Sequence, residues 1–140
     1  MNQPVSKEEL EYMAELFSQH MRREQESNGS AYEVRNTGKL ESSLAQPFQE
    51  ISGQELYPSL IKKASMLYYF CIKNHPFEDG NKRMGIFALM IYLAKNNYWL
   101  DTSDEKLFNM TVNTAASKME EKDEVVRSIE EFISDNIVKY

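Results

Sequence analysis

The sequence lacks the features that mark secreted or disulfide-bonded proteins. It has one cysteine, Cys71, which has no partner for an internal disulfide, so nothing points to an oxidising compartment. Cys71 lies in the apolar run from Leu67 to Ile72, and we expect a buried, unreactive thiol there. The N-terminus, Met1 to Pro4, lacks the basic and apolar regions of a signal peptide, which favours a cytoplasmic protein.

Long hydrophobic runs and an excess of positive charge are also missing. The longest apolar stretch, Ile86 to Ala94, is far shorter than the ~20 residues that a membrane-spanning helix needs. With 16 Lys and Arg against 22 Asp and Glu, the net charge is −6, which disfavours general binding to nucleic acid. We therefore expect neither a membrane nor a nucleic acid as partner, and a phosphate site would have to be local.

The sequence does contain a strong helical pattern. Its length and 41% hydrophobic content suit a single core, so we expect one domain over residues 1–140. A capping box of Ser6 and Glu9 opens a first helix, and Pro58 begins a second helix that ends before Pro76. A third helix, from about Asn81 to Asn96, is apolar on all sides in its centre. We expect this third helix to be the centre of a compact all-α bundle.

Two more helices are expected in the C-terminal part. Thr102 and Glu105 form a capping box that opens one of them. Apolar residues from Val125 to Ile137 mark the last one, and the charged residues 120–124 form a solvated connection between the two.

The helical pattern breaks between residues 34 and 53. A short helix is expected around Lys39 to Ala45, and Pro47 and Gly53 then bracket a short segment. That segment is either a hairpin or flap, or a plain surface loop, and the pattern alone favours the loop.

The segment His75-Pro76-Phe77-Glu78-Asp79-Gly80-Asn81-Lys82-Arg83 gathers groups that suit a nucleoside triphosphate. Gly80 permits a tight turn, and the helix that begins at Asn81 presents unpaired N–H groups and the positive end of its dipole. Lys82 and Arg83 add two cations at an end of the helix that normally favours acidic residues. This placement indicates an anion that is bound from outside.

Other residues of the segment complete the set. Asp79 offers a carboxylate to Mg²⁺, which takes only one or two from a protein and completes its shell with waters and phosphate oxygens. His75, with an ordinary pKa of about 6.5, can accept a proton from an attacking hydroxyl. Phe77 is expected to anchor the loop to the core. Each residue alone is typical of an ordinary turn, but their combination favours a functional site.

The segment resembles the signature of Fic/Doc proteins, His-Pro-Phe-x-Asp/Glu-Gly-Asn-Gly/Lys-Arg, at every fixed position. Weaker similarity covers Leu40 to Pro47, Glu55 to Pro58 and Leu107 to Ala116, the last of these toward the short death-on-curing (Doc) branch.

The resemblance implies a role for each matching residue. His75 would be the base that activates a target hydroxyl, Asp79 would hold magnesium, and Gly80, Asn81 and Arg83 would bind phosphate oxygens. A target-binding flap would hold the target segment by strand addition, and it would contain Gln46, Pro47, Phe48 and Gln49.

Two positions separate the reactions known in this family. Members that transfer nucleotides have glycine at the place of Lys82 and usually another arginine at the place of Ile86. Doc-type members share the lysine, and in them ATP is thought to lie reversed, with its γ-phosphate toward the acceptor. The resemblance therefore implies a kinase that uses ATP and Mg²⁺ and acts on a protein substrate of the translation machinery, such as elongation factor Tu.

Two alternatives stay open, namely transfer of AMP or another nucleotide to a protein hydroxyl, and a catalytically inactive protein that binds a partner. The inhibitory helix of many family members, Ser/Thr-x-x-x-Glu-Gly/Asn, has no match here, because Lys122 follows the pair Ser117 and Glu121. A toxin of this kind would need a separate antitoxin.

Overall fold

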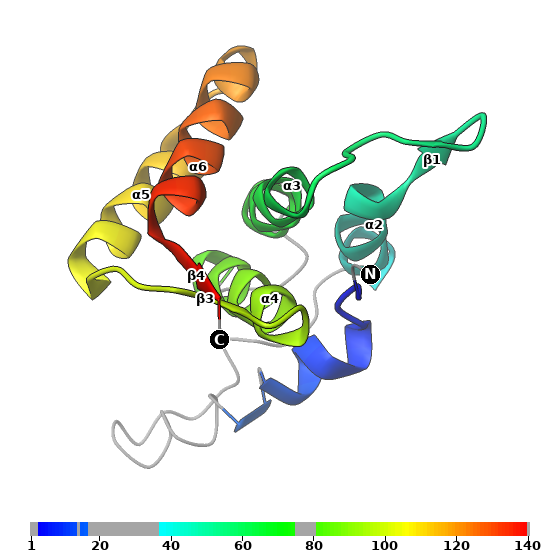
Figure 1. Cartoon of the computed structure of the whole chain (residues 1–140), viewed down its shortest axis with the longest axis horizontal. Helices are drawn as coiled ribbons and strands as arrows, with labels where there is room; N and C mark the ends of the chain where they lie inside the picture. Colours follow the sequence, from blue (N-terminus) through cyan, green and yellow to red (C-terminus); the bar gives the residue numbers. More distant parts are fainter. Residues whose placement is uncertain (1–2, 14, 17–36, 75–80, 140) are drawn as a thin grey trace.

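The computed structural model describes residues 3–13, 15–16, 37–74 and 81–139 of the chain. Within this part the protein is mostly helical, which confirms the expected all-α class (Figure 1). Residues 7–13 and 15–16 are helical, and the later helices are α2 (Thr37–Ala45), α3 (Leu60–Lys73), α4 (Asn81–Lys95), α5 (Asp104–Ala116) and α6 (Lys122–Asn136), with short 3-10 helices η1 (Gln46–Phe48) and η2 (Met119–Glu121). The strands pair as two short ribbons, β1 (Glu50–Ile51) with β2 (Gln54–Glu55) and β3 (Tyr98–Leu100) with β4 (Ile137–Lys139).

The central helix of the bundle is α3, and not the helix from Asn81 that the sequence favoured. Ser59 caps α3 by accepting a hydrogen bond from the Lys62 N–H at 3.0 Å, and all residues from Lys63 to Ile72 are buried. In Figure 1 α3 is seen end-on between α2, α4 and α6. Helix α4 buries one face, while apolar residues such as Phe87 and Ile91 on its other face are half-buried. The apolar residues all around α4 are therefore explained by one buried face and by half-buried side chains on its other faces.

Helices α3 and α4 approach each other closely at Gly85. A Cβ atom at this position would lie 2.5 Å from Cγ1 of Ile72 and 3.4 Å from the carbonyl oxygen of Tyr68. The first distance is shorter than ordinary packing allows, so a side chain at this position would force Ile72 to move, and glycine lets the two helices come this close.

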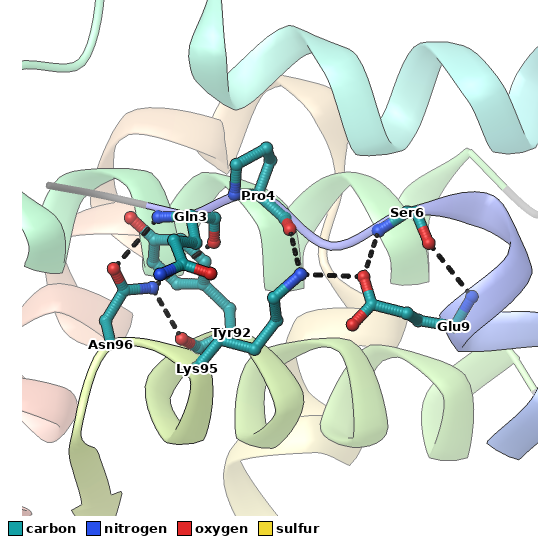
Figure 2. A network of polar contacts seen from close by, with 7 residues as sticks. All are labelled: Gln3, Pro4, Ser6, Glu9, Tyr92, Lys95 and Asn96. Atoms are coloured by element: carbon teal, nitrogen blue, oxygen red, sulfur yellow. Dashed lines mark hydrogen bonds and ion pairs between the residues drawn. The ribbon is translucent and has the colours of Figure 1, made fainter.

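The N-terminal segment is fixed to the C-terminal end of α4 (Figure 2). The expected capping box is present, because the Ser6 N–H donates to Glu9 Oε1 at 2.9 Å and the Glu9 N–H donates to Ser6 Oγ at 3.0 Å. Lys95 Nζ lies 2.8 Å from both Glu9 Oε1 and the carbonyl oxygen of Pro4. The Asn96 amide exchanges two hydrogen bonds with the backbone of Gln3. The predicted end of this first helix, at residues 27–30, lies outside the described residues.

The C-terminal helices differ from the prediction in three details, the first of which is that the expected connection at residues 120–124 consists of the end of η2 and the start of α6. Helix α5 is capped by Ser103, which accepts from the Lys106 N–H at 3.2 Å, and the expected cap at Thr102 is wrong. The last helix ends at Asn136, and Ile137 begins strand β4, which pairs with β3 and was not foreseen. Helix α5 is joined to the core by a buried hydrogen bond between Tyr68 and Thr111.

The segment after α2 forms a hairpin, so the loop favoured by pattern alone is wrong. Residues Gln46–Phe48 make a 3-10 turn first, and β1 and β2 then pair antiparallel through Ser52 and Gly53, which have φ of 53° and 79°. Both strands are exposed on all their residues. The hairpin is tied to α3 at its base, where Lys63 Nζ lies 3.1 Å from Glu55 Oε1.

Candidate functional site

The described part of the predicted site is its second half. Asn81 is the first residue of α4, and Lys82 and Arg83 follow in the first helical turn, both exposed. His75, Phe77, Asp79 and Gly80 lie outside the described residues, so their roles stay predictions.

The first turn of α4 is cationic in the structure as well. No acidic residue lies in it, whereas α5 and α6 each have two acidic residues in their first turn. Within the described ranges, Lys82 makes no ion pair. A helix N-terminus carries partial positive charge, so a lysine there costs stability unless an anion compensates it. The side chains of this turn therefore add positive charge to the positive end of the helix dipole at the start of α4.

A cavity of about 660 Å³ adjoins this turn, between α4 and α5. Lys82 and Arg83 lie at the end formed by α4, and Asp104 lies in the part formed by α5. The rest of the wall is mainly apolar, and it includes Phe108, which is 61% exposed. The other lining residues are Ile86, Phe87, Leu107 and Thr111. Such a cavity suits a ligand that has an anionic part and a flat or apolar part.

The residue before the predicted catalytic loop, Asn74, is held firmly in place. Its N–H donates to the Phe70 carbonyl at 2.9 Å, and its side-chain amide donates to Ser43 Oγ at 2.9 Å. This bond from Asn74 links the end of α3 to α2, and Ser43 Oγ in turn donates to the Lys39 carbonyl within α2 at 2.7 Å. Neither Ser43 nor Asn74 was predicted to support the site. A serine and an asparagine beside helix ends are too common to indicate this role.

The four predicted flap residues lie toward different ends of α3. Gln46 lines a second cavity together with Asn74, at the end where the loop begins. Pro47 is buried, and the Phe48 ring packs edge-on against Tyr92 with a centroid distance of 5.5 Å. The Gln49 carbonyl accepts from the Leu56 N–H at 2.9 Å, beside the hairpin.

The base of the hairpin is distant from the C-terminal end of α3. Its anchor, Lys63, precedes Asn74 by eleven residues of helix, which corresponds to roughly 16 Å along the axis of α3. The target-binding role of the flap stays a prediction, and of its members Gln46 lines a cavity together with Asn74.

Three further predictions concern cysteine, metal and membrane. Cys71 is fully buried, as expected, and burial raises the pKa of its thiol to about 12. Among the described residues there is no cluster of three or more His, Cys, Asp or Glu side chains suited to a metal, and the predicted ligand Asp79 lies outside them. None of the helices in the described part is long and apolar enough to cross a membrane.

Comparison with known proteins covers both the segment with the signature and the helices around it. The model of the Fic/DOC family matches residues 4–93. A protein of Mycolicibacterium smegmatis called Toxin Doc is 35% identical over 72 residues, which is 51% of this chain. The chain spans about half of that relative, 55% of its length.

Proposed function

Because the chain belongs to the Fic/DOC family, we propose that it transfers the γ-phosphoryl group of ATP to a hydroxyl of another protein. The observation that carries the proposal is the cationic first turn of α4, with Lys82 and Arg83 beside a cavity of about 660 Å³. The field of the helix end and two cations favour a triphosphate, and the largely apolar cavity has room for a nucleoside.

The proposal assigns a part to each residue of the segment. The backbone at Gly80 and Asn81, with Lys82 and Arg83, would bind phosphate oxygens, and Asp79 would hold Mg²⁺. When bound, the magnesium ion neutralises charge on the phosphates. Most of the catalytic effect in phosphoryl transfer comes from positioning and charge stabilisation, which is what a preformed cationic helix end supplies.

In the proposed chemical step, His75 acts as the base. The hydroxyl oxygen of the target forms a bond to the γ-phosphorus while the bond to the bridging oxygen of ADP breaks. The proton of the hydroxyl passes to the His75 imidazole, and the negative charge that leaves with ADP is stabilised by Lys82 and Arg83. A histidine has an ordinary pKa near neutrality, so it can act without strong activation.

Lys82 and Ile86 favour γ-transfer over nucleotide transfer. Both residues line the cavity, one turn apart on α4. A lysine stem occupies the space that glycine leaves open in nucleotide-transferring members, and the aliphatic Ile86 cannot bind a terminal phosphate. AMP or other nucleotidyl transfer remains the second candidate, and an inactive partner-binding protein is the third.

The biological setting that we propose is a toxin with a separate antitoxin. The relative named Toxin Doc supports this setting. A component of the translation machinery, such as elongation factor Tu, is the proposed target. Protein mass spectrometry after induction in cells would identify the modified protein, and the mass of the added group would distinguish phosphate from a nucleotide.

ATP labelled separately at the α and γ positions tests the reaction. Cell extract proteins that acquire the γ label with the intact chain, and not with His75→Ala, would support the kinase. Acquisition of the α label would overturn γ-transfer in favour of nucleotide transfer. If neither label is acquired and His75→Ala still arrests growth on overexpression, the inactive partner-binding protein is the better description.

The substitution Lys82→Gly tests the argument about space. We expect it to weaken γ-transfer far more than folding, because Lys82 is exposed and the fold loses only helix propensity, about 1 kcal/mol. Full kinase activity in this variant would show that Lys82 does not select the orientation of ATP.

A further inference from the structure

An exposed aromatic ring lies on the α5 wall of the cavity between α4 and α5. Phe108 lines this cavity and is 61% exposed. Within the described part of the chain, it has no ring stacking or cation–π contact. The other exposed aromatic side chains of this part, Tyr12 and Trp99, do not line the cavity. Phe108 is therefore an aromatic face that is open to a ligand of this cavity.

The helix that carries Phe108 is tied to the core close to this residue. The Thr111 hydroxyl donates to the Leu107 carbonyl at 2.7 Å, and it is also hydrogen-bonded to the buried hydroxyl of Tyr68 on α3. Thr111 lines the same cavity, so the anchor lies in the wall itself. Because this wall is fixed without a ligand, little backbone order has to be gained when a ligand packs on the Phe108 ring.

The two walls of the cavity differ in charge. Lys82 lies on the α4 wall, is exposed, and makes no ion pair with a described residue. The α5 wall instead carries the carboxylate of Asp104, one helical turn before Phe108. A carboxylate repels phosphate groups. The phosphates of a nucleotide are therefore favoured at the α4 wall, and its uncharged base is left to the α5 wall.

A flat aromatic face suits a nucleobase better than an aliphatic side chain does. Aromatic side chains stack on bases, and the contact tolerates any base because every base has a π-face. The remaining apolar lining residues of α5 and α4 include Leu107 and Ile86, which add surface but no second face for stacking.

We propose that Phe108 is the stacking platform for the base of the nucleotide whose phosphates bind beside Lys82. The identity of the ligand rests on the proposed function. The inference adds to that function a binding residue on α5, outside the segment from His75 to Arg83. It requires no catalytic step, so it can be tested by binding alone.

The test is calorimetric titration of the full chain in the presence of magnesium. One ligand is AMP-PNP, an ATP analogue that is not hydrolysed at its terminal phosphate, and the other is inorganic tripolyphosphate, which has no base. We expect Phe108→Ala to bind AMP-PNP about tenfold more weakly than the parent protein does, because the stacking contact is lost. Its affinity for tripolyphosphate should equal that of the parent.

Three further variants separate stacking from other effects. Val112→Ala also removes an exposed apolar side chain from α5, but outside the cavity, and it should bind AMP-PNP as the parent does. Phe108→Tyr keeps the ring and should retain the affinity. Phe108→Leu keeps apolar volume without a flat face, and it should bind AMP-PNP about as weakly as Phe108→Ala. Melting temperatures check that the proteins are folded, and the Tyr and Leu variants carry the test if the Ala variant is not.

Parent affinity for AMP-PNP in Phe108→Ala or Phe108→Leu would overturn the proposal. Equal weakening of AMP-PNP and tripolyphosphate would overturn it too, because the effect would then not depend on the base. If labelled ATP modifies a protein while Phe108→Ala binds AMP-PNP normally, the proposed function stands and the platform fails. If AMP-PNP binds as expected but no label is transferred, the platform stands and the proposed function fails. A parent protein that does not bind AMP-PNP would overturn both.

Discussion

The two ends of α4 place a lysine in opposite settings. At the C-terminal end, Lys95 meets the negative end of the helix dipole and contacts Glu9 and the carbonyl of Pro4, each at 2.8 Å. At the N-terminal end, Lys82 meets the positive end of the dipole, is exposed, and has no ion pair with a described residue.

The difference separates a charge that stabilises the fold, at Lys95, from a charge that is available to a ligand, at Lys82. The chain supplies every partner that Lys95 needs, so that end of the helix is complete without a ligand. The N-terminal end would be more stable with acidic residues, as α5 and α6 have in their first turns. In the proposed function, an external anion is the partner that makes the charge of Lys82 at this end favourable.

The largest expected effect is on activity at the N-terminal end. Arg83→Ala should lower the rate of phosphoryl transfer about 100-fold, because a cation that stabilises the transition-state charge is lost. Steady-state kinetics with labelled ATP measures the change. Arg127→Ala, which removes an exposed arginine on α6, should retain the parent rate. Parent activity in Arg83→Ala would remove Arg83 from the site.

The middle of α4 should respond through packing. Gly85→Ala adds a methyl group 2.5 Å from Ile72 Cγ1, and overpacking of this kind costs about 1–3 kcal/mol. The gain in helix propensity, about 1 kcal/mol, offsets part of this cost. Urea unfolding measures the difference. With Ile72→Ala, which makes room for the methyl group, the double variant should be more stable than the sum of the single effects predicts. Simple additivity would mean that Gly85 and Ile72 are not in conflict.

Charge reversal at Lys95 and at Lys82 should have unequal effects on stability. Lys95→Glu places a carboxylate beside Glu9 and at the negative end of the dipole, so we expect the free energy of unfolding to fall by about 1 kcal/mol. Lys82→Glu should leave it unchanged or raise it by about 0.5 kcal/mol, because an acidic side chain suits a helix N-terminus. Equal losses in the two variants would remove the contrast between the ends.

The smallest expected effect is the pH dependence of the Glu9 contact. Burial alone would raise the pKa of Glu9, but hydrogen bonds from Lys95 and from Ser6 outweigh it, and the net pKa lies below the ordinary value. The ionised carboxylate therefore stabilises the fold above its unfolded pKa, and this stabilisation is lost as the pH falls through the folded pKa. Thermal melts between pH 3 and 7, roughly the range of carboxylate titration, should show Glu9→Gln less stable at neutral pH and closer to the parent in acid.

Local signals in the sequence predicted the local parts of the fold. The capping box of Ser6 and Glu9 depends on neighbouring residues, and so does the start of α4 at Asn81. Thr102 was the predicted cap of α5, but Ser103 is the observed one. Both residues have a hydroxyl group, so the sequence alone could not decide between them. From the sequence alone a lysine such as Lys63 is expected at the surface. Lys63 is only 2% exposed, because the hairpin brings Glu55 and the Tyr57 carbonyl to its ammonium group.

The same distinction holds for the candidate site. The cations at the start of α4 could be predicted, because a helix boundary and two basic residues are contiguous. The wall that Phe108 and Asp104 contribute could not, since it depends on how α5 packs beside α4. The strand pair of Trp99 with Val138 was missed for a similar reason, because its partners are far apart in the chain and its strands are only three residues long.

The hydrogen bonds of Lys73 have a thermodynamic consequence. They join the last turn of α3 to the carbonyl oxygens at the C-terminal end of α5. Helix α5 forms one wall of the first cavity, and Lys73 itself lines the second. If ligands in the two cavities bind different positions of α5 with different affinity, their binding is coupled, and by linkage the factor is the same in both directions.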